Sequence, residues 1–272
     1  VSDNLRCDGI VDEVRISKIA RTEFMTGRPA ERPKPTAKLI PVKLKKNSFL
    51  RSMVVSRAAK APTLDGRLKD AAWAGVPVAA FVTSMEAKTP KTPTEVRAVY
   101  DDKNLYIALR GLEKGQETQR VGPSGHDDRK MFKGDGIEVF LQPLGAGKPY
   151  YQIVVNAAGG VLDLKWPKAK KPDFKWTCAG VRVAGQVRPD DWIIEAAIPF
   201  KSLGMSAPAP GAEWRANFCR NEQPTSELTA WSYTGGGFQI PKRFGVLKFG
   251  VKPEAAGAKC PGVAEVRGMA LE

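Results

Sequence analysis

The stretch that most constrains the fold is residues 132–141, with the sequence FKGDGIEVFL. Its Gly-Asp-Gly turn leads directly into a strand, in which successive side chains point to opposite faces. Three apolar residues share one face: Ile137, Val139 and Leu141. Glu138 and Phe140 share the other face. One apolar and one mixed face are typical of a strand with a core behind it, so the sequence predicts a sheet with a free polar surface here.

Alternating segments of this kind recur along the chain and show almost no helical period. Residues 150–156 form the next one, and the Gly/Pro-rich connection before it suits an antiparallel pair. The strands that we expect lie near residues 94–100, 104–110, 136–142, 150–156, 190–198, 213–220 and 244–249. Short strands separated by Gly/Pro turns predict an all-β fold, a two-sheet antiparallel β-sandwich of the immunoglobulin-like or jelly-roll type with Gly/Pro-rich loops.

The net charge of +14 is concentrated in two segments rather than spread over the expected sandwich. Residues 26–60 contain ten Lys or Arg against one acid, and residues 165–175 contain five lysines against one acid. A basic linker and a basic loop are solvated segments, not a shaped groove for phosphates. We therefore expect no nucleic-acid partner. No apolar run approaches the ~20 residues of a membrane helix, so we also expect no membrane span.

The four cysteines, at positions 7, 178, 219 and 260, are widely spaced and form no Cys-x-x-Cys pair. With the single His126 they do not make a standard zinc site. A bridge between Cys178 and Cys219 requires neighbouring strands, and free thiols are favoured because the cysteine count is low for a disulfide scaffold.

The chain divides into four segments by composition. Residues 1–25 contain one strand pattern, GIVDEVRIS followed by ART, which resembles the closing strand of a concanavalin A-like or laminin-G-like lectin domain. Residues 26–53 are a basic Pro/Lys linker, 54–250 the main sandwich domain and 251–272 a C-terminal tail. Because the chain begins at Val1 and one strand cannot fold alone, we interpret it as a piece of a longer protein.

Six motifs of the main domain recur in the order of a known family. They are APTLDGRLKDAAW (61–73), VYDDKNLYI (99–107), GDGIEVF (134–140), WIIEAAIPF (192–200), WRANFCR (214–220) and FG (244–245). Over residues 54–250 the chain thus resembles the carbohydrate-binding module family 9-like domains. The resemblance implies a two-sheet β-sandwich that binds a polysaccharide or oligosaccharide. It also implies a monomeric, non-catalytic module within a multidomain, secreted (extracellular or periplasmic) protein of the glycoside hydrolase type.

The resemblance also implies a set of sugar-binding residues. Two tryptophans of the family clamp a sugar ring, and Phe132 and Phe238 stand at those positions here. The polar groups of the family's site match Glu138, Gln152 and Asn217, and Arg220 replaces an acidic residue. We expect the two phenyl rings to approach each other over a shallow cleft, with the four polar side chains on its floor, where they hydrogen-bond hydroxyl groups.

Several other side chains need a structural interpretation. Glu195 lies in an apolar strand and needs a buried partner, for which Arg215 or Arg220 is the natural candidate. Trp166 and Trp176 bracket the lysine-rich loop, and packing at the sheet edge is favoured over a glycan contact. Catalysis by Glu138 needs a second carboxylate, and the sequence shows none at a suitable spacing, so we expect no enzymatic activity of this domain.

Two alternatives to sugar binding stay open at this point. One is a structural spacer with a degenerate site, since both clamp positions hold Phe rather than Trp. The other is a haem- or redox-ligand-binding sandwich, for which His126 is the only histidine available as an axial ligand. We expect no required cofactor; acids near turns are compatible with a structural calcium ion, although no Asp-x-Asp-x-Asp loop requires one.

Overall fold

The computed structural model describes residues 50–112, 122–168, 171–223 and 226–250. The expected lectin-like strand, nearly all of the linker and the C-terminal tail lie outside these residues. The strands are β1 (Ser52–Arg57), β2 (Ala79–Ala80), β3 (Val82–Thr83), β4 (Thr94–Tyr100), β5 (Asn104–Leu112), β6 (Gly136–Gln142), β7 (Tyr150–Val155), β8 (Val161–Lys168), β9 (Lys171–Asp173), β10 (Arg182–Val187), β11 (Asp191–Pro199), β12 (Glu213–Asn221), β13 (Leu228–Ala230) and β14 (Gly245–Phe249). Four short 3-10 helices connect them: η1 (Ala71–Trp73), η3 (Arg129–Lys133), η4 (Phe200–Leu203) and η5 (Pro241–Arg243).

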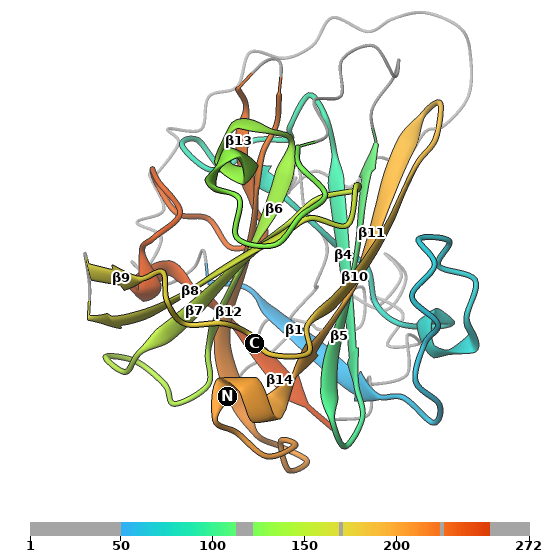
Figure 1. Cartoon of the computed structure of the whole chain (residues 1–272), viewed down its shortest axis with the longest axis vertical. Helices are drawn as coiled ribbons and strands as arrows, with labels where there is room; N and C mark the ends of the chain where they lie inside the picture. Colours follow the sequence, from blue (N-terminus) through green and yellow to red (C-terminus); the bar gives the residue numbers. More distant parts are fainter. Residues whose placement is uncertain (1–49, 113–121, 169–170, 224–225, 251–272) are drawn as a thin grey trace, which may run out of the picture. The chain divides into compact units, whose positions relative to one another are not determined.

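These strands form two sheets that share strand β1 (Figure 1). The first sheet has the order β9-β8-β7-β6-β12-β14-β1. β13 pairs with the C-terminal end of β12, along the same edge where β14 pairs with its N-terminal end. The second sheet has the order β10-β11-β5-β4-β1. In Figure 1, β6 to β9 and β12 lie to the left, β4, β5, β10 and β11 to the right, and β1 and β14 between them. The predicted all-β sandwich is confirmed, and its seven expected strands match β4, β5, β6, β7, β11, β12 and β14.

Strand β1 departs from the purely antiparallel arrangement that the sequence predicted. Its first four residues pair in parallel with β14, and Ser56 and Arg57 pair in parallel with β4. Hairpin connections enforce antiparallel pairing, but β1 is far in sequence from β14 and about 37 residues from β4, so no tight turn restricts its direction. This single strand crosses from one sheet to the other and closes the sandwich along one side.

The main core fills the space between the two sheets. Its members come from the inward faces of both, for example Val139, Ile153 and Phe218 from the first sheet and Ile107 and Ile194 from the second. The inward positions alternate with outward ones along each strand, as the period of two requires. Among the described residues no helix is long and apolar enough to cross a membrane.

The outer face of the second sheet is covered by the segment 61–76. Trp73 of this segment packs on Val99, Tyr106 and Ala197. Glu195, on the same face, is fully buried and accepts hydrogen bonds from the backbone N–H of Gly66 at 2.6 Å and from Trp73 Nε1 at 2.8 Å.

The expected arginine partner of Glu195 is therefore wrong. Donors from the covering segment, rather than an arginine, satisfy this carboxylate, and Asp65 N is a third one at 3.1 Å. The motif around Trp73 and the motif around Glu195 are thus joined by hydrogen bonds in this chain.

Candidate functional site

The outer face of the first sheet brings together most of the polar residues predicted from the sequence. Directly paired residues share a face, and the register pairs Cys219 with Glu138 and Glu138 with Val154. One step along the strands, Asn217 pairs with Phe140, and Phe140 pairs with Gln152. Glu138, Gln152 and Asn217 therefore lie on one surface, which we call the Glu138 face.

A chain of hydrogen bonds fixes the side chains on this face. Gln152 Nε2 donates to Glu138 Oε2 at 2.6 Å, and Trp166 Nε1 donates to Gln152 Oε1 at 2.8 Å. The Glu138 side chain is nearly buried, with 8% of the residue exposed. Burial raises the pKa of Glu138 to about 7, although the hydrogen bond from Gln152 acts in the opposite direction. This carboxyl group thus changes charge near neutral pH.

Trp166 packs on β8, next to the edge strand of the first sheet, as the sequence interpretation favoured, and it also contacts the Glu138 face. Its indole is stacked on the Tyr150 ring, with centroids 5.4 Å apart and planes 8° apart, while its N–H orients Gln152. The signal that identifies it is the alternation in β8, where Leu162, Leu164 and Trp166 share the face of Gln152. The indole is half-buried, so part of it stays accessible beside the Glu138 face.

Asn217 lies on the Glu138 face, but its side chain forms hydrogen bonds with backbone groups. Its Nδ2 donates to Ser232 O at 2.9 Å, and its Oδ1 accepts from the N–H groups of Ser232 and Phe218 at 2.9 and 3.0 Å. It is fully buried. The role that its contacts support is to attach the segment after β13 to β12, which positions the loop that contains Phe238.

Arg220 is not on the floor of the site, and the prediction that placed it there is wrong. It pairs with Ile137 on the core side of the sheet. Its guanidinium forms a bidentate ion pair with Asp135: Nε donates to Oδ1 at 3.0 Å and Nη2 donates to Oδ2 at 2.7 Å. The same group lies over the Trp192 ring, with Cζ 5.0 Å from the ring centroid. Residues 217 and 220 have opposite parity along β12, so they point to opposite faces.

The phenyl ring of Phe238 does not line an open cleft, and the predicted clamp is wrong on this side. Phe238 is 5% exposed and packs against Phe140, Cys219 and Phe244. The glycines before it let the loop fold back, and the N–H of Gly235 donates to Ser84 O at 2.8 Å. Burying an aromatic ring removes roughly 150–250 Å² from water, which favours this folded-back loop.

Phe132 is exposed, as predicted. It lies in η3 and is 36% exposed. Its neighbour Met131 is buried against Val154, the cross-strand partner of Glu138, and against Leu162. Helix η3 therefore covers part of the Glu138 face and presents the Phe132 ring to solvent at its edge.

The two other carboxylates of the motifs 134–140 and 192–200 lie away from the Glu138 face. Asp135 is bound to Arg220 on the core side, and Glu195 is enclosed beneath the segment that covers the second sheet. Glycosidases need two carboxyl groups on either side of one bond. Neither Asp135 nor Glu195 shares the Glu138 face.

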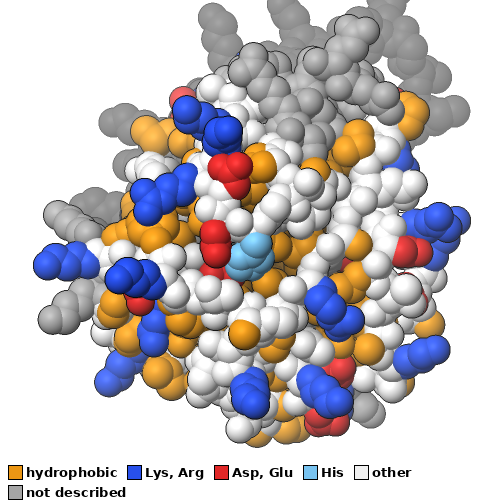
Figure 2. Space-filling view, in the orientation of Figure 1, with side chains coloured by type: hydrophobic (Ala, Val, Ile, Leu, Met, Phe, Trp, Pro, Cys, Tyr) orange, Lys and Arg blue, Asp and Glu red, His pale blue; other side chains and the backbone are white. Residues whose placement is uncertain are grey.

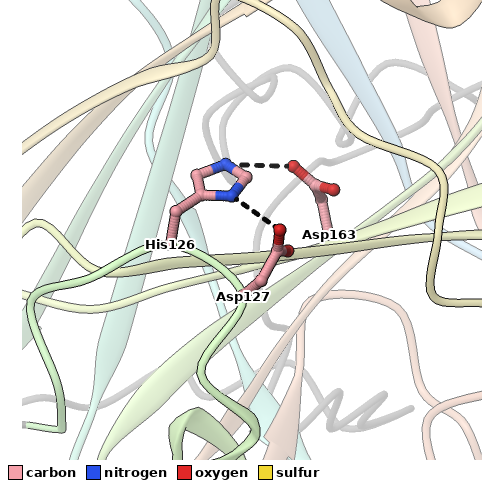
Figure 3. A group of neighbouring side chains, drawn as sticks. All are labelled: His126, Asp127 and Asp163. Atoms are coloured by element: carbon pink, nitrogen blue, oxygen red, sulfur yellow. Dashed lines mark ion pairs between the residues drawn. The ribbon is translucent and has the colours of Figure 1, made fainter.

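A separate cluster consists of His126, Asp127 and Asp163 (Figure 3). His126 lies between the two carboxylates, with Nδ1 3.1 Å from Asp127 Oδ2 and Nε2 3.3 Å from Asp163 Oδ2. Figure 2 shows the pale blue imidazole against red carboxylates at the surface. Calcium takes six to eight oxygen ligands, roughly, so one imidazole and two carboxylates do not fit a calcium site. Both imidazole nitrogens lie within 3.3 Å of a carboxylate oxygen.

Comparison with known proteins gives one family. The model of the family described as "Carbohydrate family 9 binding domain-like" matches residues 64–250. No curated protein shows significant similarity to the chain.

Six solved chains match this one, and three of them show what the fold is similar to. A putative carbohydrate-binding protein from Bacteroides uniformis has a TM-score of 0.61 at 17% identity, covering 74% of this chain and 99% of that one. A carbohydrate binding module family 9 from Caldicellulosiruptor kristjanssonii in complex with glucose has a TM-score of 0.54 at 18% identity, covering 76% and 100%. A module of that family from the same organism, in complex with cellotriose, has a TM-score of 0.52 at 19% identity, covering 76% and 97%. Because the family model spans residues 64–250, well over half of the sequence, the chain belongs to the carbohydrate family 9 binding domain-like family.

Proposed function

We propose that the protein binds carbohydrate as a non-catalytic module and that the Glu138 face is its binding surface. The observation that supports this is the Glu138 carboxylate. Only its Oε2 accepts a hydrogen bond from the described residues, and Oε1 retains contact with solvent. An accessible oxygen on an otherwise nearly buried carboxylate can accept a further hydrogen bond from a ligand. A sugar hydroxyl group is such a donor.

The neighbouring side chains suit a sugar ring as well. Trp166 holds Gln152, and Gln152 in turn keeps the Glu138 carboxylate in one orientation. Binding a ligand therefore costs little side-chain conformational entropy at these residues. Phe132 offers an exposed aromatic ring on which the apolar face of a pyranose can stack. One ring therefore does the stacking, since Phe238 is buried.

The kind of ligand follows from the relatives. The two Caldicellulosiruptor kristjanssonii structures are complexes with glucose and with cellotriose. We take gluco-configured mono- and oligosaccharides as the first ligands to test. In the wider setting we propose a monomeric module of a secreted glycan-degrading protein of the glycoside hydrolase type, which needs no cofactor to bind sugar.

Nucleic acid is not a partner in this proposal. On the face drawn in Figure 2 the lysines and arginines are dispersed among uncharged side chains rather than gathered into a stripe. Dispersed cations give weak, salt-sensitive contacts with phosphates.

The test is calorimetric titration of the full chain with glucose and with cellotriose. Stacking contributes on the order of 1 kcal/mol, so Phe132→Ala is expected to weaken binding about five-fold. Val187→Ala is the control, because Val187 is 37% exposed but lies on β10, at the far edge of the second sheet. Absence of binding, or equal affinities for wild type and Phe132→Ala, contradicts the proposal.

The burial of Phe238 favours a second candidate, a structural spacer whose sugar site has closed. A spacer binds none of the saccharides, and its Glu138→Gln variant differs from wild type only in stability. Measurable glucose or cellotriose affinity that depends on Glu138 decides for the binding module.

A further inference from the structure

A cavity of about 440 Å³ lies on the outer face of the second sheet, beside the segment that contains Trp73. Its lining is unusually basic, with Arg67, Lys69, Arg97, Arg110 and Arg188 against one acid, Asp70. The volume is that of a small-molecule site. It is separate from the Glu138 face, which belongs to the other sheet.

Two of these arginines are presented by neighbouring strands. Arg97 on β4 pairs with Ala108 and Arg110 on β5 pairs with Glu95, so the two arginines are diagonal neighbours on one face. Diagonal positions are about 7–8 Å apart, which is a distance that one ligand group can bridge with two guanidinium groups. The sheet therefore fixes the separation of the two cations.

Arg110 is oriented by Asp191 and keeps most of its donors. Its Nε donates to Asp191 Oδ2 at 2.6 Å, while Arg188 holds the same carboxylate through Nε and Nη2 at 2.5 and 2.6 Å. Burial acts to raise the pKa of Asp191, but these three hydrogen bonds and the two positive charges keep it below its ordinary value. The terminal amino groups of Arg110 have no hydrogen-bond partner among the described residues.

Arg97 is less well satisfied. Its side chain is 21% exposed, and its closest carboxylate, on Glu95, lies 3.9 Å away. That distance is too long for a hydrogen bond, and no other acceptor reaches its guanidinium from the described part of the chain. The guanidinium nitrogens of Arg97 keep contact with solvent but have no close acceptor, so a bound anion can supply the acceptors that they lack.

We propose that this cavity is a second binding site, which takes the carboxylate or sulfate group of an acidic saccharide between Arg97 and Arg110. The planar guanidinium fork matches the oxygen pairs of both groups. Arg67 and Lys69, on the covering segment, complete the site from the other side. The saccharide part rests on the proposed function, whereas the oxyanion part rests on the cavity alone.

The test is calorimetric titration of the full 272-residue chain at low salt with glucose 6-sulfate, glucuronate, glucose and sodium sulfate. Arg97→Gln is expected to weaken glucose 6-sulfate and glucuronate binding about ten-fold, and Arg67→Gln a few-fold. Arg67 is well exposed, so its variant folds even if Arg97→Gln does not. Arg57→Gln is the control, since it removes the same charge from a surface pair with Asp102 outside the cavity.

Each result has a defined meaning. Anionic sugars that bind no better than glucose, or whose affinity is the same in Arg97→Gln, Arg67→Gln and wild type, overturn the proposal. Sulfate that binds as tightly as glucose 6-sulfate overturns its saccharide part. Glu138→Gln separates the two sites: it is expected to weaken glucose binding and to leave the Arg97-dependent binding of sulfate unchanged, whichever way the proposed function is decided.

Discussion

Replacing Glu138 by Gln tests the site most directly, because the charge of the carboxyl group changes with pH, whereas the amide of the variant stays neutral. The Gln side chain keeps the size of Glu and can still accept the hydrogen bond from Gln152. What it removes is the negative charge. Any difference between wild type and Glu138→Gln that appears only at high pH therefore comes from ionised Glu138.

The size of the effect on binding follows from the hydrogen bond lost. A bond to a charged acceptor contributes about 1.5–3 kcal/mol, so at about pH 8.5 the variant is expected to bind glucose or cellotriose roughly 10- to 100-fold more weakly. At about pH 5.5 the wild-type carboxyl is protonated, because its pKa is raised to about 7, and the two proteins are expected to bind alike. Wild-type affinity should rise through neutral pH.

Stability is expected to change in the opposite direction. The folded protein keeps the Glu138 proton up to about pH 7, whereas the unfolded chain loses it near the ordinary value of 4.5. The folded state therefore binds more protons between these values, and the free energy of unfolding falls as pH rises through this window. The pKa shift corresponds to a decrease of about 3 kcal/mol in the free energy of unfolding of the wild type across this pH window. Glu138→Gln should not show this decrease, because its amide does not ionise.

The assays are calorimetric titration and urea denaturation of both proteins across this pH range, with Glu86→Gln as control. Glu86 is well exposed and paired with Lys88, so its replacement removes a charge without touching the Glu138 face. Equal sugar affinities of wild type and Glu138→Gln at high pH refute the role of Glu138 in binding. Parallel stability profiles of the two proteins refute the raised pKa.

Two further predictions concern stability and reactivity. Glu195→Ala leaves the N–H groups of Gly66 and Trp73 without their buried acceptor, so it should lower the free energy of unfolding by about 3 kcal/mol or more in urea denaturation, whereas exposed Glu213→Ala should change it by less than about 0.5. Burial raises the pKa of the Cys178 thiol to about 12, so this thiol should resist Ellman's reagent at about pH 8 in the folded protein and react once unfolded, as read by mass spectrometry of the labelled peptides. Rapid labelling of Cys178 in the folded protein would contradict its burial.

Much of the fold could be predicted because it depends on local patterns. Alternation in 136–142 and 150–156 placed Ile137 and Val139 in the core and Glu138 on the opposite face, and the structure has both placements. The same rule, applied to β12, separates Asn217 from Arg220, so the sequence alone contained the evidence against Arg220 as a floor residue. The free thiols of Cys178 and Cys219 also agree with the low cysteine count.

The site itself was decided by contacts between segments that are distant in sequence. Phe238 is buried because Phe140, nearly a hundred residues earlier, offers it an apolar surface, and Glu195 is satisfied by Trp73 from a segment more than a hundred residues away. Trp166 orients Gln152 only because β7 and β8 lie in this register. Side-chain period is a property of one strand, so the sequence determines which face a residue occupies. What lies over that face depends on how loops and covering segments pack to bury apolar area and satisfy polar groups, and only the tertiary structure decides it.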